Sequence, residues 1–203
     1  MPQISVVNYG MGNLRSVKTS LQKLGANVLI TDNPTKIAES DAIILPGVGA
    51  FAPAVENLAP LFEVLKQSMK DGKPFFGICL GLQLLFTRST EGGSSTNGLG
   101  FIYGDILKLP SNVKTPQMGW NTIEIAKFHP ILEGIPNHSY FYFVHTYIPQ
   151  HTEPDAVLAT TEYGVHFPSI IGKQSVFATQ FHPEKSSKTG LKILENFVKT
   201  VKR

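Results

Sequence analysis

The sequence has little of several features that define common classes of protein. It contains a single cysteine, Cys79, which excludes an internal disulfide framework and any zinc or iron–sulfur site built from several cysteines. No apolar run approaches the roughly 18–20 residues that a membrane-spanning helix needs. Charged residues make up only 16% of the chain, too few for a disordered one. We therefore expect a folded, cytoplasmic protein.

The surplus of positive charge is small, because 18 Lys and Arg face 15 Asp and Glu, a net charge of +3. The basic residues are scattered, so we expect neither nucleic acid nor a membrane as a partner. The N-terminus lacks a basic stretch followed by a long apolar run, so we expect no signal peptide. The hydrophobic content of 42%, with no internal repeat, predicts a single domain over residues 1–203.

The first half of the chain alternates short apolar runs with stretches of helical periodicity. The runs predict strands, and Leu14, Val17, Leu21 and Leu24 share one helix face that ends at Gly25. This rhythm predicts parallel strands joined by helical crossovers. The predicted strands are 4–8, 27–31, 41–45 and 74–78, and the later helices are 54–70 and 80–88.

After residue 88 the pattern changes from helices to short strands joined by turns. The stretch 89–100, rich in Gly, Ser and Thr, predicts a loop, and 187–202 predicts a final helix. The chain is therefore expected to be an α/β protein, with a mostly parallel central sheet, helices on both faces and additional antiparallel strands. The later predicted strands are 101–109, 121–125, 140–148, 156–161 and 175–180.

The most informative stretch is Gly77-Ile78-Cys79-Leu80-Gly81, at a predicted strand-to-helix junction. Gly-x-Cys-x-Gly is the cysteine version of the nucleophile elbow, whose glycines let a sharp turn fit against neighbouring strands. The helix dipole then favours a thiolate at the turn. A lone cysteine is more often a small buried hydrophobe, but the glycine bracket after an apolar strand favours a nucleophile.

A cysteine nucleophile needs a base and a group that orients the base. Six histidines are available, and His182 stands out because it follows a predicted strand that Pro183 ends. Glu184 lies two residues on, across the rigid proline. It is placed to accept from one imidazole nitrogen while the other faces the thiol.

Two segments together resemble the class I, triad-type glutamine amidotransferases, over the whole chain: 77–83 and 180–184. The pair is highly specific in this order. The resemblance implies a flavodoxin-like, Rossmann-like α/β domain. It also implies that Cys79, His182 and Glu184 form a triad that hydrolyses glutamine to glutamate and ammonia through a thioester.

Further segments narrow the resemblance to the glutaminase subunits of imidazole glycerol phosphate synthase (the HisH family) in histidine biosynthesis: 8–13, 46–49, 118–121, 142–147 and 182–187. The implied partner is a (β/α)₈-barrel cyclase subunit, forming a heterodimer, which makes imidazole glycerol phosphate and AICAR with the ammonia. The implied partner-interface residues are Asn13, Trp120, Tyr142 and Lys185.

The tetrahedral oxyanion needs preorganised N–H donors. The backbone of Gly47, Val48 and Gly49 and the N–H of Leu80 are the natural sources. By resemblance, the substrate glutamine is bound by five further residues: Gln83, Glu91, His145, Thr146 and Tyr147. Trp120 is the only tryptophan, and the sequence leaves open whether it is an exposed anchor or a core aromatic.

Three alternatives remain to be weighed. Another class I glutaminase, such as the pyridoxal phosphate synthase subunit or an anthranilate-type partner, fits residues 46–49 and 118–121 less well. Cysteine peptidases and deglycases of similar fold place histidine beside the nucleophile, where this chain has Leu80. A binding module without activity would usually lack a triad member.

Gly10-Met11-Gly12 matches only part of a dinucleotide-binding pattern, since Arg15 stands where the pattern has its last glycine. We therefore expect no cofactor, and we also expect no metal.

Overall fold

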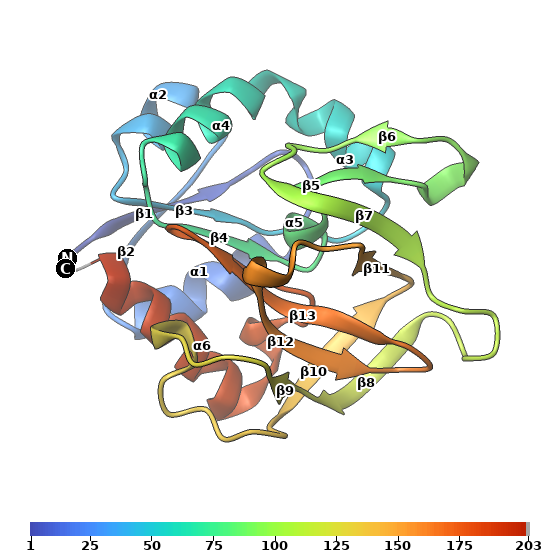
Figure 1. Ribbon diagram of the computed structural model, residues 1–203. Helices are drawn as coiled ribbons and strands as arrows, with labels where there is room; N and C mark the ends of the chain where they lie inside the picture. The colour runs from blue at the N-terminus through green and yellow to red at the C-terminus, as the bar shows by residue number, and fades with distance from the viewer. Residues whose placement is uncertain (202–203) are drawn as a thin grey trace.

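The computed structural model describes residues 1–201, which are built around one eight-stranded mixed sheet (Figure 1). Neighbouring strands run parallel through the first part of the sheet, in the order β2–β1–β3–β4–β14. They are β2 (Asn27–Thr31), β1 (Gln3–Val7), β3 (Ala42–Leu45), β4 (Phe75–Ile78) and β14 (Val176–Thr179). Antiparallel strands then continue the sheet: β13 (His166–Lys173), β12 (Val157–Glu162) and β9 (Glu124–Ile125).

Helices cover both faces of this sheet, because its central strands are apolar on both sides. On one face lie α1 (Leu14–Lys23) and α6 (Ser187–Val201), and on the other lie α2 (Pro34–Glu39), α3 (Phe51–Leu58) and α4 (Phe62–Lys70) (Figure 1). Consecutive strand residues point to opposite faces. Phe76 thus packs in the core with α1 and α6, and Phe75 in the core with the other three helices. The predicted α/β fold class is confirmed.

Two smaller sheets flank the large one at the carboxyl ends of its parallel strands. One pairs β10 (Tyr140–His145) with β8 (Gln117–Thr122), and the other has the order β11–β7–β5–β6. Its strands are β11 (Tyr147–Gln150), β7 (Ile102–Lys108), β5 (Phe86–Ser89) and β6 (Thr96–Asn97). Short helical turns complete the chain: α5 (Leu80–Gln83), η1 (Ala59–Leu61), η2 (Glu91–Gly93), η3 (Pro130–Leu132), η4 (Pro154–Ala156) and η5 (Pro183–Lys185).

The structure corrects several predicted boundaries. The predicted helix 80–88 is wrong beyond Gln83, because the chain enters β5, which pairs with β7. The predicted loop 89–100 contains η2 and the short strand β6, and α2 and β13 had no predicted counterpart. The predicted strand 140–148 is divided at Thr146 between two sheets. The predicted final helix is confirmed through Val201, and its predicted end at Lys202 lies outside the described residues.

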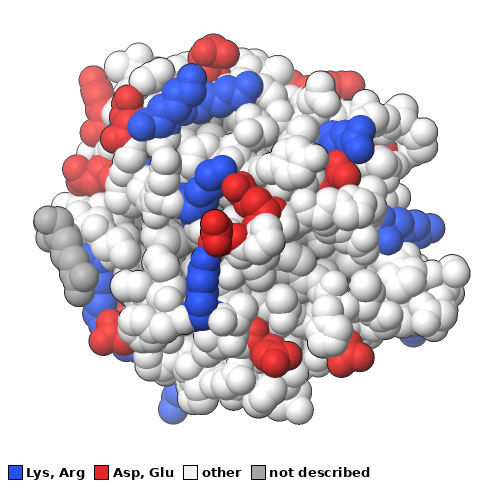
Figure 2. Space-filling view, in the orientation of Figure 1, with Lys and Arg blue, Asp and Glu red and all other residues white. Residues whose placement is uncertain are grey.

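The surface is mixed in charge where Figure 2 displays it, with Lys and Arg beside Asp and Glu. The ion pairs include Arg88 with Asp105 and Lys173 with Glu153. Within residues 1–201, no helix combines the length and the apolar character that crossing a membrane requires.

Candidate active site

Cys79 lies in a sharp turn between β4 and α5, at the carboxyl edge of the large sheet. Its backbone has φ 53° and ψ −104°, a positive φ that residues with side chains rarely adopt. The turn fits because its neighbours are glycines. A Cβ at Gly81 would lie 1.9 Å from the carbonyl oxygen of Leu45 on β3, and a Cβ at Gly77 would lie 2.7 Å from that of Gly81. The chain thus makes the strand-to-helix turn that the glycine pattern predicts.

His182 reaches the same edge because β14 lies parallel to β4. Pro183 then begins η5, which turns Glu184 back toward the imidazole ring. The Nδ1 of His182 donates to Oε1 of Glu184 at 2.9 Å, and each side chain is 1% exposed. Burial acts to lower the pKa of His182, but the neighbouring Cys79 and Glu184 raise it to about 10. Within residues 1–201, Nε2 has no hydrogen-bond partner, which leaves it free for proton transfer.

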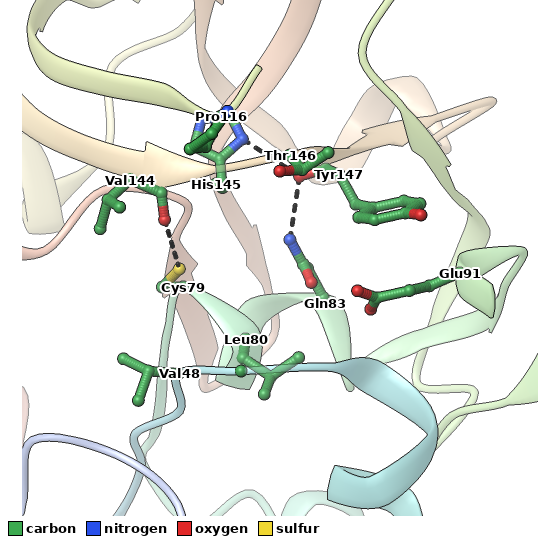
Figure 3. A pocket seen from close by; sticks show the side chains of 11 residues that line it. Val48, Cys79, Leu80, Gln83, Glu91, Pro116, Val144, His145, Thr146 and Tyr147 are labelled. Atoms are coloured by element: carbon green, nitrogen blue, oxygen red, sulfur yellow. Dashed lines mark hydrogen bonds between the residues drawn. The ribbon is translucent and has the colours of Figure 1, made fainter.

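The turn at Cys79 opens onto a cavity of about 310 Å³ (Figure 3), a size at the small end of the range for small-molecule sites. All five predicted substrate-binding residues line it, together with Val48, Gly49 and Leu80 of the predicted oxyanion donors. Gly47 is buried behind the wall of the cavity, where a Cβ would lie 2.5 Å from the Tyr9 hydroxyl. The structure therefore gathers segments 48–49, 79–83, 91 and 145–147 around one space.

In one wall of the cavity, the carbonyl oxygen of Tyr147 accepts hydrogen bonds from two side chains (Figure 3). It accepts from Nε2 of Gln83 at 2.9 Å and from Nδ1 of His145 at 3.1 Å. A carbonyl only accepts, so His145 carries its proton on Nδ1. Burial lowers the pKa of His145 to about 4, which keeps the ring neutral near pH 7.

The opposite wall includes Val48 and Gly49, and the segment 46–49 to which they belong is held from two sides. The Tyr9 hydroxyl donates to the carbonyl oxygen of Pro46 at 2.8 Å. Burial raises the pKa of Tyr9, and the charge of Cys79 is a second, smaller cause. At the far end, Oε2 of Glu91 accepts from the N–H of Phe51 at 2.7 Å, at the start of α3. Glu91 therefore joins the loop after β5 to the helix that follows the predicted oxyanion segment.

Several residues at the site were not predicted from the sequence. Pro116 and Val144 line the cavity, and the Val144 carbonyl oxygen accepts from Sγ of Cys79 at 3.8 Å. Tyr9 and Gln180 contact the site from within the core. Gln180 had a usable signal, because it ends the predicted strand 175–180 and lies two residues before His182. Nothing local in the sequence marks Tyr9, whose role depends on a contact across two strands.

The predicted interface residues lie outside the cavity, on elements that adjoin one another. Trp120 on β8 is 53% exposed and pairs with Tyr142 on β10, their rings 6.2 Å apart and edge-to-face. Lys185 is exposed on η5, which contacts both β10 and α1, and Asn13 precedes α1. The structure thus answers the question about Trp120, because its side chain is exposed rather than part of the core.

The chain matches one family model and many curated sequences. The family model described as "Glutamine amidotransferase class-I" matches residues 5–201. The "Imidazole glycerol phosphate synthase subunit HisH" of Methanocaldococcus jannaschii is 51% identical, with 96% of this chain and 98% of that protein covered. The protein of the same name from Caldanaerobacter subterraneus subsp. tengcongensis is 48% identical, with 98% of each covered.

Solved structures with low sequence identity share the same fold. The structure of PurLQS from Thermotoga maritima aligns with a TM-score of 0.76 at 18% identity, covering 98% of each chain. The Trypanosoma brucei CTPS glutaminase domain, solved with bound acivicin, aligns with a TM-score of 0.68 at 16% identity, covering 98% of this chain and 94% of that one. At such identities the likeness concerns the fold alone.

Proposed function

The chain belongs to the class-I glutamine amidotransferase family, and from that premise we propose how its cavity carries out the reaction. It is a glutaminase, with the function of the glutaminase subunit of imidazole glycerol phosphate synthase in histidine biosynthesis. The observation that carries the mechanism is the turn at Cys79 beside the buried His182–Glu184 pair. Residues 1–203 act in this proposal as one glutamine amidotransferase domain.

In the proposed mechanism, Cys79 attacks the γ-amide carbon of glutamine as a thiolate, with His182 carrying the proton. His182 gives that proton to the departing ammonia and then removes one from the water that hydrolyses the thioester. Glu184 holds Nδ1–H and stabilises the imidazolium, so that Nε2 always faces the reacting atoms. The 2.9 Å contact between buried groups supports this division of roles.

The oxyanion of each tetrahedral intermediate requires N–H donors already in position, and each donor contributes roughly 3–4 kcal/mol. We assign these donors to Leu80 and the segment 47–49. Leu80 and Val48 lie on the cavity beside Cys79, which supports the assignment. Gly49 has a φ of +110°, so this segment uses backbone conformations that a side chain would strain.

The five other lining residues are proposed to hold the amino-acid part of glutamine. Glu91 supplies a carboxylate for the α-ammonium group, and Gln83 supplies polar atoms beside the nucleophile. The segment His145–Thr146–Tyr147 supplies backbone groups. The support is that all of them border one small cavity with Cys79 at its end.

Ammonia released in the cavity needs an acceptor on another chain, since we find no second catalytic motif in the sequence. The relatives are named as synthase subunits, which supports a cyclase partner. We propose a heterodimer with a (β/α)₈-barrel cyclase, docked on the surface of Asn13, Trp120, Tyr142 and Lys185. The exposed, edge-to-face Trp120–Tyr142 pair suits an interface hot spot.

The test is ammonia release from glutamine by the chain alone and with the cyclase chain, for the wild type and for Cys79→Ala. The account expects glutamine hydrolysis that the partner increases, and none in Cys79→Ala although that variant remains folded. Ammonia release by Cys79→Ala within a few-fold of the wild type would refute the mechanism. Equal turnover with and without the partner would refute control by the cyclase and leave the nucleophile unaffected.

A further inference from the structure

Within residues 1–201, the sulfur of Cys79 has two hydrogen-bond partners. The carbonyl oxygen of Val144 lies 3.8 Å away, and Nε2 of Gln180 lies 3.7 Å away. The two neighbours suit opposite states of the sulfur. A thiol can donate its proton to the carbonyl of Val144, whereas a thiolate has only acceptor capacity and needs a donor. Gln180 is the neighbour that can serve the thiolate.

The orientation of the Gln180 amide follows from a chain of hydrogen bonds that begins at a main-chain carbonyl. The carbonyl oxygen of Tyr147 only accepts, so the group of Gln83 that contacts it at 2.9 Å must be its NH₂. The same NH₂ lies 3.4 Å from the Gln180 side chain, which must present its oxygen there. The NH₂ of Gln180 is then directed at the sulfur of Cys79. A flipped Gln180 amide would place two donors together and an acceptor against the thiolate.

Burial strengthens this contact. Gln180 is 0% exposed and Gln83 is 5% exposed, so water does not compete with these amides. The backbone N–H of Gln180 donates to the carbonyl oxygen of Ser169 at 2.9 Å, which fixes the side chain's point of attachment. A hydrogen bond to an ionised acceptor is stronger than a neutral one, and more so where the local dielectric is low.

We propose that Gln180 is a further catalytic residue, which stabilises the thiolate of Cys79 by donating from Nε2 to its sulfur. Gln83 is the positioning residue that sets the orientation of this donor. The inference rests on the proposed role of Cys79 as the nucleophile. It gives Gln180 a task in the resting enzyme, before glutamine binds, that is distinct from the proton transfer assigned to His182.

The test is the rate at which iodoacetamide alkylates the full chain as a function of pH. Cys79 is the only cysteine, so the rate reports on this sulfur alone. In Gln180→Leu the donor is lost, and we expect the midpoint of the profile to move to higher pH, with alkylation near neutral pH about ten-fold slower. Gln180→Glu replaces the donor with acceptors and should move the midpoint at least as far.

The matched control is Ser169→Ala, another fully buried residue beside Gln180, whose Oγ has no hydrogen-bond partner within residues 1–201. Its profile should coincide with that of the wild type. Thermal unfolding identifies variants that fail to fold. Gln83→Leu provides a second route, because it frees the Gln180 amide to rotate and should shift the profile in the same direction by less.

If Gln180→Leu folds and its pH profile is unchanged from that of the wild type, the proposal is overturned. If Gln180→Leu does not fold, an unchanged profile in Gln83→Leu overturns it instead. Equal shifts in Gln180→Leu and Ser169→Ala would also overturn it, since they would indicate packing rather than hydrogen bonding. Ammonia release by the wild type with the cyclase chain is measured separately. Its absence would refute the glutaminase mechanism, while an unshifted profile in an active enzyme would refute only the role of Gln180.

Discussion

The parallel part of the large sheet and the flanking antiparallel strands contribute to the cavity in different ways. Beside β3 and β4, the backbone contacts around Cys79 are so close that a single methyl group would disturb them, and β14 brings His182 to the same edge. β8, β10 and β11 supply the opposite wall at Val144–Tyr147 and also expose Trp120. On our proposal the parallel part carries the chemistry, and the added strands contribute part of the substrate contact and part of the docking surface.

The largest expected effect follows from removing the proposed base. His182→Ala should lower glutamine turnover by roughly 10⁴-fold or more, because no other group in the triad can move the proton. Glu184→Gln should be milder by roughly 10- to 100-fold, since an amide oxygen can still accept from Nδ1. Steady-state kinetics with the cyclase chain measure both losses, and losses of equal size would mean that Glu184 does more than orient the ring.

A methyl group at the turn tests the rigidity of the parallel part. In Gly81→Ala the new Cβ would meet the carbonyl oxygen of Leu45 at 1.9 Å, so we expect a loss of more than about 3 kcal/mol in unfolding free energy. The control is Gly72→Ala, where φ is +77° but no atom lies within 4 Å. There we expect a loss of about 1 kcal/mol from backbone strain alone. Urea unfolding that ranks the two variants equally would contradict the steric account.

The two buried histidines should affect stability with opposite dependence on pH. The pKa of His182 is raised to about 10, so its contribution to stability is present below its unfolded value of about 6.5 and is lost as pH rises toward 10. The pKa of His145 is lowered to about 4 by burial, so its contribution is present above about 6.5 and is lost as pH falls toward 4.

Chemical unfolding across this pH range, for the wild type, His182→Gln and His145→Gln, measures the two effects. The stability difference between the wild type and His182→Gln should shrink at alkaline pH, and that for His145→Gln should shrink at acidic pH. Differences that do not vary with pH would show that neither ring titrates as the structure indicates.

The smallest effect on the fold is expected at the exposed tryptophan. Trp120→Ala should change the unfolding free energy of the free chain by no more than about 0.5 kcal/mol, yet weaken binding to the cyclase chain by about 2 kcal/mol or more. Phe128→Ala is the control, since Phe128 is 82% exposed on another segment and should alter neither quantity. Calorimetric titration that finds equal affinities for the wild type and Trp120→Ala would remove Trp120 from the interface.

The same contrast explains how much of the fold the sequence could predict. The elbow at Cys79 was predictable because its constraint is local, two glycines around one residue after an apolar strand. The strand β5 was mistaken for helix, because its residues pair with β7, and pairing across such a distance leaves no local pattern. β13 contains Pro168, a residue that usually argues against a strand, and the irregular pairing of β12 near Ala159 and Thr160 lies beside it.

The residues of the site also fall into two groups, those that a local sequence pattern predicts and those that depend on contacts between distant segments. The proposed triad of Cys79, His182 and Glu184 could be predicted from residue types and spacing, and the structure brings Glu184 to His182 as the sequence predicts. Gln180 was not identifiable as a donor, because its role depends on two amide groups, one carbonyl and one sulfur that meet from three separate segments. Tyr9 was missed for the same reason, since its hydroxyl acts across two strands.

The most direct test of the account is covalent labelling by diazo-oxo-norleucine, a reactive mimic of glutamine, followed by peptide mass spectrometry. The account predicts one adduct per chain, on the peptide that carries Cys79, slowed by glutamine in competition and absent in Cys79→Ala. An adduct on any other residue, or none on a chain that hydrolyses glutamine, would contradict the assignment of Cys79 as the nucleophile.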